Sequence, residues 1–197
     1  MPQYFDADPS VASAPKEVVW SLPDGPVRLL TDRGVFGYGT VDSGTKLLLL
    51  SVPPPPATGH LLDLGCGTGA IAITLARRAP DATVWAVDVN LRARELCAAN
   101  AERNAISNVR VVAPDELPAE VRFSTMWSNP PIRIGKAALH TLLLEWLARL
   151  DAEASAFLVV QKHLGADSLQ RWMQERGHAA ERIAVGAGFR VLRVAAR

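Results

Sequence analysis

The chain has 197 residues and a formal net charge of +1, and 49% of its residues are hydrophobic. This length and composition suffice for one substantial core, so we expect one globular domain with a small appendage and no global electrostatic attraction to nucleic acid. Two cysteines are too few for a disulfide framework or a metal-ligand cluster, and no signal peptide or long apolar stretch is evident, so we expect no metal and a cytoplasmic location.

The first fifty residues are predicted to form a lead-in, a small β-hairpin and a loop. Residues 1–15 are rich in Pro, Ala, Asp and Ser, which favours a mobile lead-in. Alternating apolar residues flank a turn signal at 23–26, which predicts the hairpin. The glycine-rich segment 31–45 is predicted to be a loop, and 46–50 begins a short apolar segment. We expect an N-terminal unit at 16–50 and the main domain at 51–197.

From His60 onward, β-like runs alternate with helix-like runs, which predicts an α/β fold with a parallel sheet covered on both faces. The predicted strands are 60–64, 83–87, 109–112, 123–127 and 156–160. The predicted helices are 70–79, 91–104, 136–150 and 168–176. Segments 181–185 and 189–194 flank a glycine-rich turn and predict a terminal antiparallel hairpin, which would make a mostly parallel, seven-stranded sheet.

The first of these strands ends in Asp63-Leu64-Gly65-Cys66-Gly67-Thr68-Gly69, where alternating glycines allow a ligand to approach the backbone closely. With Ala70 the glycines also fit the dinucleotide fingerprint, and Asp88 lies at about the 20-residue spacing of the ribose-binding acid, so a nicotinamide cofactor stays open. The carboxylate of Asp63 would repel a pyrophosphate but suits the α-ammonium group of S-adenosylmethionine. Charge therefore favours the methyl donor.

Acids follow the next two strands at the edge where ligands bind in open parallel sheets. Asp88 can accept hydrogen bonds from both hydroxyls of a ribose, and Asp115 can accept one from an adenine amine. Either residue would also serve as a helix N-cap, and for Asp115 the two roles are about equally favoured.

Asn129-Pro130-Pro131 follows the fourth strand, and its two prolines remove backbone N–H donors. The side-chain oxygen of Asn129 and the carbonyl of Pro130 can then accept both protons of a planar amine and direct its lone pair at a methyl group. The alternative is a rigid loop in which the asparagine satisfies its own backbone. The order of the motifs favours the functional interpretation.

These residues resemble the class I S-adenosylmethionine-dependent methyltransferases of the N-P-P type, with a Rossmann-like fold. Segments 34–48, 129–136, 160–162 and 188–192 look like the RsmC-like branch, which includes the bacterial enzyme that makes N2-methylguanosine in small-subunit ribosomal RNA. The resemblance implies that the methionine moiety is held by Asp63, Gly65, Cys66, Gly67 and Gly69. It also implies Asp88 for the ribose, Asp115 for the adenine, Asn129 and Pro130 for the target amine, and Phe36 and Thr45 near the cofactor.

Two departures from the family bear on the substrate. Ile132 stands where N-P-P enzymes usually carry Phe or Tyr to stack on the target base, which leaves Phe36 or Tyr38 to provide stacking. The longer bacterial enzyme has a degenerate methyltransferase half with no counterpart in this sequence, so RNA must dock on the catalytic domain or a partner. The expected substrate contacts are Pro131, Ile132, Arg133 and Lys136.

The expected function is methylation of an exocyclic amine of a nucleobase, foremost guanine N2 in ribosomal RNA. Alternatives are methylation of protein glutamine amides or adenine N6, and a binding module that keeps the cofactor pocket without catalysis. A nicotinamide oxidoreductase is less favoured, because no placed histidine or Tyr-x-x-x-Lys motif is visible.

Overall fold

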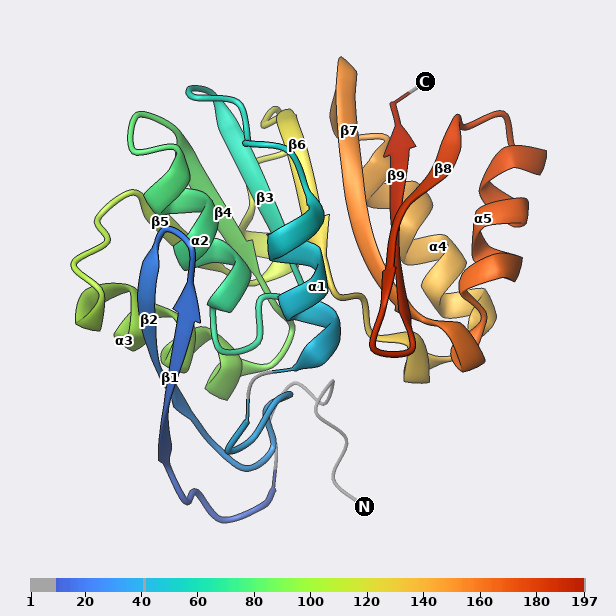
Figure 1. Cartoon of the computed structure of the whole chain (residues 1–197). Coiled ribbons are helices and arrows are strands. Elements are labelled where there is room, and N and C mark those ends of the chain that lie inside the picture. Colours follow the sequence, from blue (N-terminus) through green and yellow to red (C-terminus); the bar gives the residue numbers. More distant parts are fainter. Residues whose placement is uncertain (1–9, 41, 197) are drawn as a thin grey trace.

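The computed structural model describes residues 10–40 and 42–196 and contains one mixed sheet with helices on both faces (Figure 1). The strands are β3 (His60–Leu64), β4 (Thr83–Val87), β5 (Val109–Val112), β6 (Phe123–Ser128), β7 (Leu150–Gln161), β8 (Ala180–Gly186) and β9 (Phe189–Ala195). Their order is β5-β4-β3-β6-β7-β9-β8, with β9 antiparallel to both β7 and β8. This arrangement confirms the predicted seven-stranded, mostly parallel sheet and its C-terminal hairpin.

Alternation of side chains along the strands divides the core between two helical layers. Leu61 and Trp127 face the layer of α1 (Ser43–Ser51), α2 (Ala70–Arg78) and α3 (Leu91–Arg103). Leu62 and Met126 face the opposite layer of α4 (Lys136–Leu147) and α5 (Ala166–Glu175). No helix among the described residues is long and apolar enough to cross a membrane.

The N-terminal hairpin consists of β1 (Lys16–Leu22) and β2 (Gly25–Thr31), as predicted, and packs on α2 and α3. Two asparagines one turn apart, Asn100 on α3 and Asn104 at its C-cap, hold β2 through its backbone. Asn100 accepts from the N–H of Leu30 at 2.7 Å and donates to its carbonyl at 2.8 Å. Asn104 does the same for Arg28, at 3.0 and 2.7 Å. The hairpin is thereby tied to the main sheet's helical layer.

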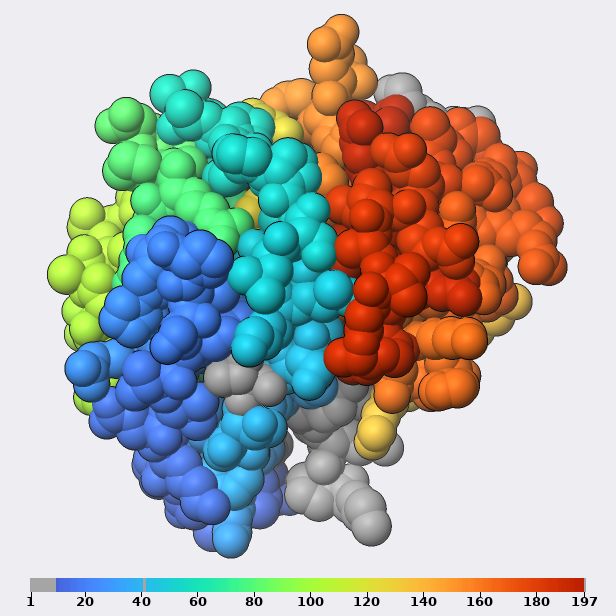
Figure 2. Space-filling view, viewed as in Figure 1, coloured from blue at the N-terminus to red at the C-terminus, as the bar shows by residue number. Residues whose placement is uncertain are grey.

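The last residues of the predicted lead-in contact the domain. Ser13 Oγ and the N–H of Ala14 both donate to the carboxylate of Asp32 at 2.6 Å. Residues 1–9 of the lead-in lie outside the described residues. The boundary predicted at residue 50 falls within α1, whose exposed surface lies between the N-terminal hairpin and the C-terminal strands (Figure 2).

The structure corrects two sequence predictions. The segment expected to be a loop up to residue 45 already contains the start of α1, because Asp42 caps the helix by accepting the N–H of Thr45 at 2.7 Å. The following leucine run has no gap that would mark a helical period, so the helix was hidden in the sequence. The predicted helix 136–150 ends at Leu147, and β7 begins at Leu150 rather than at residue 156.

Candidate active site

A cavity of about 620 Å³ opens at the carboxyl ends of the central strands, a size typical of small-molecule sites. Most of the predicted site residues line it: Phe36, Thr45, Gly65, Cys66, Gly67, Asp88, Asn129, Pro130, Pro131, Ile132 and Arg133. Asp63, Gly69, Asp115 and Lys136 do not. The glycine loop and the N-P-P loop, which are far apart in the sequence, thus share one cavity.

The glycine loop presents open backbone to this cavity. The N–H groups of Gly65 and Cys66 donate to the carbonyl of Val87 at 2.8 and 3.1 Å, which holds the loop over the end of β4. Gly65 and Gly67 have φ of +75° and +52°, and a Cβ added at either position would meet no atom within 4 Å. Side chains there would project into the space that a cofactor needs, so the loop fits a closely held ligand.

Gly69 has a different role from the first two glycines. It precedes α2 with φ of +86°, and a Cβ there would lie 2.7 Å from Sγ of Cys97 on α3. The third glycine of the motif therefore allows α2 and α3 to pack closely.

Asp63 lies behind the glycine loop and is completely buried. Its Oδ2 accepts the N–H of Ala72 at 2.9 Å, whereas its Oδ1 has no hydrogen-bond partner among the described residues. Burial, reinforced by the charge of Asp88, raises the pKa of Asp63 to about 8. The unpaired buried oxygen suits a donor group of a ligand seated above the loop.

Asp88 connects the loops that follow β3 and β4. Its two carboxylate oxygens accept the N–H groups of Gly67 and Asn90, each at 2.9 Å, and each oxygen retains a further acceptor site. Burial raises the pKa of Asp88, and backbone hydrogen bonds from Asn90, Gly67 and Val89, together with the charge of Arg94, oppose that shift. Asp115 is exposed in the 3-10 turn after β5, where its neighbour Pro114 lines the cavity.

The N-P-P loop forms a tight turn after β6. Pro131 has φ of −74° and ψ of +75°, and the N–H of Ile132 donates to the carbonyl of Pro130 at 2.8 Å, which is an inverse γ-turn. The carbonyl oxygen of Pro130 keeps one lone pair for a second donor. Ile132 packs on the α4 side of the core and also lines the cavity.

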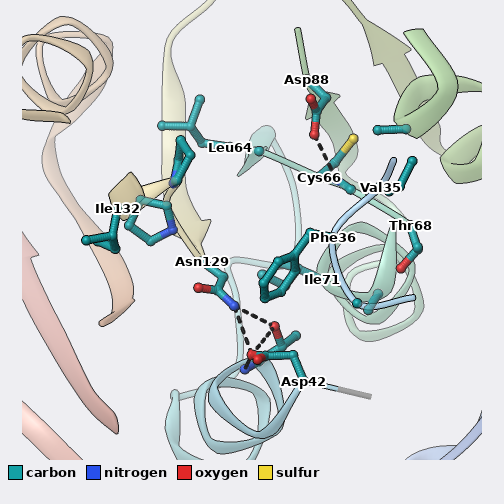
Figure 3. A pocket seen from close by; sticks show the side chains of 18 of the residues that line it. Val35, Phe36, Asp42, Leu64, Cys66, Thr68, Ile71, Asp88, Asn129 and Ile132 are labelled. Carbon is teal, nitrogen blue, oxygen red and sulfur yellow. Dashed lines mark hydrogen bonds between the residues drawn. The ribbon is translucent and has the colours of Figure 1, made fainter. Parts of the chain in front are cut away.

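The side chain of Asn129 is oriented by two residues at the start of α1 (Figure 3). Its Nδ2 donates to Oδ2 of Asp42 at 2.9 Å and to Oγ1 of Thr45 at 3.0 Å. The Thr45 hydroxyl donates its own proton to the same Asp42 oxygen at 3.2 Å, so Oγ1 acts as the acceptor in its hydrogen bond with Asn129 Nδ2. Both amide protons of Asn129 are thus engaged toward α1, and its Oδ1 is left for a ligand.

The cavity is also lined by residues to which the sequence assigned no role, among them Asp42, Gln161, Leu164 and Phe189. Asp42, Gln161 and Phe189 lie in segments 34–48, 160–162 and 188–192, which carry the family resemblance, and Asp42 also has helix-capping spacing before Thr45. Of the two predicted stacking residues, Phe36 lies beside Asn129 in the cavity (Figure 3), whereas Tyr38 does not line it and has Lys16 over its ring at 4.9 Å.

The predicted substrate contacts divide between two hollows. Arg133 is exposed at the rim of the main cavity, and Lys136 lines a smaller one of about 100 Å³ that shares Ile132. Within the described part of the chain, His, Cys, Asp and Glu form no cluster suited to a metal ion.

Comparison with known proteins shows the family of the chain. The family "Methyltransferase small domain" matches residues 26–193. YbxB of Bacillus subtilis is 35% identical over 175 residues, 87% of each chain. Ribosomal RNA small subunit methyltransferase C of Pseudomonas fluorescens is 30% identical over an alignment of 202 positions, which covers 93% of this chain and 55% of the relative. The chain therefore spans about half the length of this ribosomal RNA methyltransferase.

A solved structure gives the same result at the level of the fold. The 16S rRNA N2 G1207 methyltransferase (RsmC) of T. thermophilus, solved with AdoMet and guanosine, superposes with a TM-score of 0.81 at 27% identity. The match covers 96% of this chain and 52% of that one. This chain therefore belongs to the methyltransferase small domain family, as an RsmC-like class I S-adenosylmethionine-dependent methyltransferase.

Proposed function

We propose that the chain transfers a methyl group from S-adenosylmethionine to an exocyclic amine of an RNA base, with guanine N2 in ribosomal RNA as the substrate. The observation that carries this proposal is the orientation of Asn129. Asp42 and Thr45 engage both of its amide protons, which leaves its Oδ1 available beside the free lone pair of the Pro130 carbonyl. Two acceptors match the two protons of a planar amine.

The residues that would hold the donor lie on the β3 and β4 side of the cavity. Gly65 and Gly67 leave room for it against the backbone, and Asp88 offers acceptor sites for ribose hydroxyls. The unpaired oxygen of Asp63 would accept a hydrogen bond from an ammonium group above the loop. When bound, S-adenosylmethionine supplies an electrophilic methyl group on a positively charged sulfur.

The acceptor side aligns and stabilises the attacking nitrogen. Hydrogen bonds from the amine to Asn129 Oδ1 and the Pro130 carbonyl orient its lone pair toward the methyl group. As the new N–C bond forms and the S–C bond breaks, positive charge develops on the nitrogen, and the same two oxygens stabilise it. One amine proton then leaves to solvent, so the product is a neutral secondary amine. This chemistry therefore requires no side chain that acts as a general base.

The choice of an RNA base rests on the relatives. The matched proteins of P. fluorescens and T. thermophilus are named as methyltransferases of ribosomal RNA, and the latter was solved with guanosine. Arg133 and Lys136 beside the N-P-P loop would contact phosphates. An enzyme with this substrate would work in the cytoplasm.

A labelled-donor assay tests the proposal. The chain is incubated with methyl-labelled donor in three parallel reactions. Their acceptors are unmethylated small-subunit ribosomal RNA, assembled subunits and a protein fraction. Nucleoside mass spectrometry should find N2-methylguanosine, and Asn129→Ala should lower its formation at least about 100-fold while S-adenosylhomocysteine still binds. Label on N6-methyladenosine or on protein glutamine would show that the substrate is adenine or protein rather than guanine N2. Cofactor binding without any transfer would favour the non-catalytic module.

A further inference from the structure

Three neighbouring strands present one side chain each at the acceptor side of the cavity. Asn129 follows β6, Gln161 ends β7 and Phe189 begins β9. β7 pairs with both of the other strands, and Gln161 and Phe189 are direct partners across the antiparallel β7–β9 pair. Side chains at such a position lie next to each other on one face of the sheet.

The period of the strands puts all three side chains on the face covered by α1. Trp127, Val159 and Val191 belong to the core on this face, and each lies two residues from Asn129, Gln161 and Phe189 respectively. In agreement with this register, the three residues line the same cavity.

The positions of Gln161 and Phe189 in the sheet separate them from the residues that would bind the methyl donor. The glycine loop follows β3 and Asp88 follows β4, while β7 and β9 lie on the other side of β6. Asn129 therefore stands between a donor half of the cavity and a half bounded by Gln161 and Phe189.

The two side chains have complementary chemistry and are available to a ligand. The half-buried ring of Phe189 packs against the start of α1 so closely that a Cβ on Gly44 would lie 2.6 Å from its Cδ1. The half-buried side-chain amide of Gln161 makes no hydrogen bond to any described residue, so it can both donate and accept. An aromatic surface and a free amide are the usual means of holding an unstacked RNA base.

We propose that Gln161 and Phe189 form the seat of the acceptor base. Phe189 supplies the aromatic contact that Ile132 does not, and the Gln161 amide pairs with the edge of guanine next to the reacting amine. That edge carries one donor, N1–H, and one acceptor, O6, which a single amide can satisfy together. The proposal rests on the proposed function, because it names the residues that select the substrate of that site.

Kinetics on an oligoribonucleotide that contains the mapped guanine test the seat. Phe189→Leu should lower kcat/KM by about 10- to 100-fold, the usual loss for one base–aromatic stack, and Phe189→Tyr should restore it to within about threefold. Affinity for S-adenosylhomocysteine should stay within about twofold. Trp172→Leu, which removes a half-buried ring from α5 on the opposite face, is the matched control and should leave kcat/KM unchanged.

The role of Gln161 is tested with a modified substrate. An oligoribonucleotide with 2-aminopurine at the target position keeps the 2-amino group and lacks both N1–H and O6. The wild type should prefer guanine at least about tenfold, because the analogue has no N1–H to pair with the amide oxygen and no O6 to pair with the amide NH2 group. Gln161→Leu should lose this preference, whereas Phe189→Leu should keep it. Equal preference in the wild type and Gln161→Leu would overturn the role of Gln161.

Saturation-transfer NMR separates failure of the seat from failure of the proposed function. With S-adenosylhomocysteine present, guanosine should give a signal with the wild type that is lost with Phe189→Leu. The seat would be overturned if the Phe189 and Gln161 variants had the kinetics and guanosine binding of the wild type. An inactive Asn129→Ala in the same experiment would leave the proposed function intact. A wild type that neither methylates RNA nor binds guanosine would overturn both.

Discussion

One oxygen of Asp42 both caps α1 and holds the amide of Asn129. Oδ2 accepts the N–H of Thr45 at 2.7 Å and the Nδ2 of Asn129 at 2.9 Å, and these two residues are 84 positions apart in the chain. The element that begins the helix is therefore the same one that fixes which end of the Asn129 amide faces the cavity. An amide rotated by 180° would present donors to an amine that needs acceptors.

This relationship predicts that Asp42→Ser lowers kcat with little change in stability. Serine caps a helix about as well as aspartate but is too short to hold Asn129. Loss of a charged hydrogen bond of about 1.5–3 kcal/mol corresponds to a decrease in kcat of about 10- to 100-fold. Steady-state kinetics and thermal unfolding measure the two effects.

Asp42→Asn is the conservative control for this prediction. Its side-chain oxygen can take the place of Oδ2 and keep all three hydrogen bonds, so most of the activity should return. Wild-type kcat in the serine variant would show that Asp42 serves only as a helix cap.

The second and third glycines of the motif should respond differently to substitution. Gly67→Ala puts a methyl group into the cavity, so S-adenosylhomocysteine affinity should fall at least about tenfold while the left-handed backbone costs about 1 kcal/mol of stability. Gly69→Ala brings a Cβ to 2.7 Å from Sγ of Cys97, so the free energy of unfolding should fall by about 2 kcal/mol or more. Calorimetric titration and urea unfolding measure both variants. A loss of stability without a loss of binding in Gly67→Ala, and the opposite in Gly69→Ala, would contradict these roles.

Buried Asp63 should make stability fall as the pH rises. Its pKa is about 8 in the folded chain and about 4 when unfolded, so between these values the folded state binds more protons. The stabilisation is complete below about pH 4 and is lost as the pH rises through about 8, with a slope of at most about 1.4 kcal/mol per pH unit. Asp63→Asn, which cannot ionise, should lack this dependence.

Urea unfolding from pH 5 to 8 measures the Asp63 effect as a difference between wild type and variant. The excess stability of the wild type over Asp63→Asn should shrink as the pH rises, since contributions from other titrating groups cancel. Asp81→Asn, which changes an exposed carboxyl, is the control. Parallel curves for wild type and Asp63→Asn would show that the buried carboxyl does not hold its proton.

The sequence predicted those parts of the molecule that depend on local patterns. The boundaries of β3, β4 and β5 agree with prediction, because each strand is a short β-like run that ends at a break: Gly65 follows β3, Asp88 follows β4 and Ala113-Pro114 follows β5. The position of Asn129 at a strand end was also predicted. Its orientation was not, because that depends on Asp42, a residue from a distant helix start that no local pattern links to it.

The seat formed by Gln161 and Phe189 was hidden for a related reason. The segments 160–162 and 188–192 carry the family resemblance, but no role was assigned to Gln161 or Phe189 from the sequence. Only the register of the antiparallel β7–β9 pair puts them opposite each other, and only the crossover of β9 next to β7 puts them beside the N-P-P loop.

The identity of the donor can be tested through Asp88. Asp88→Ala removes the acceptor of the Gly67 N–H and the acceptors available to a ribose, so S-adenosylhomocysteine should bind at least about 100-fold more weakly in calorimetric titration. Asp88→Asn separates the two effects, because its amide oxygen can still hold Gly67 while its NH2 group faces one ribose hydroxyl; affinity should be intermediate. NADH should not bind the wild type, since the carboxylate of Asp88 opposes a pyrophosphate above the glycine loop. Equal affinity for NADH and S-adenosylhomocysteine, or undiminished binding by Asp88→Ala, would contradict the placement of the donor on this side of the cavity.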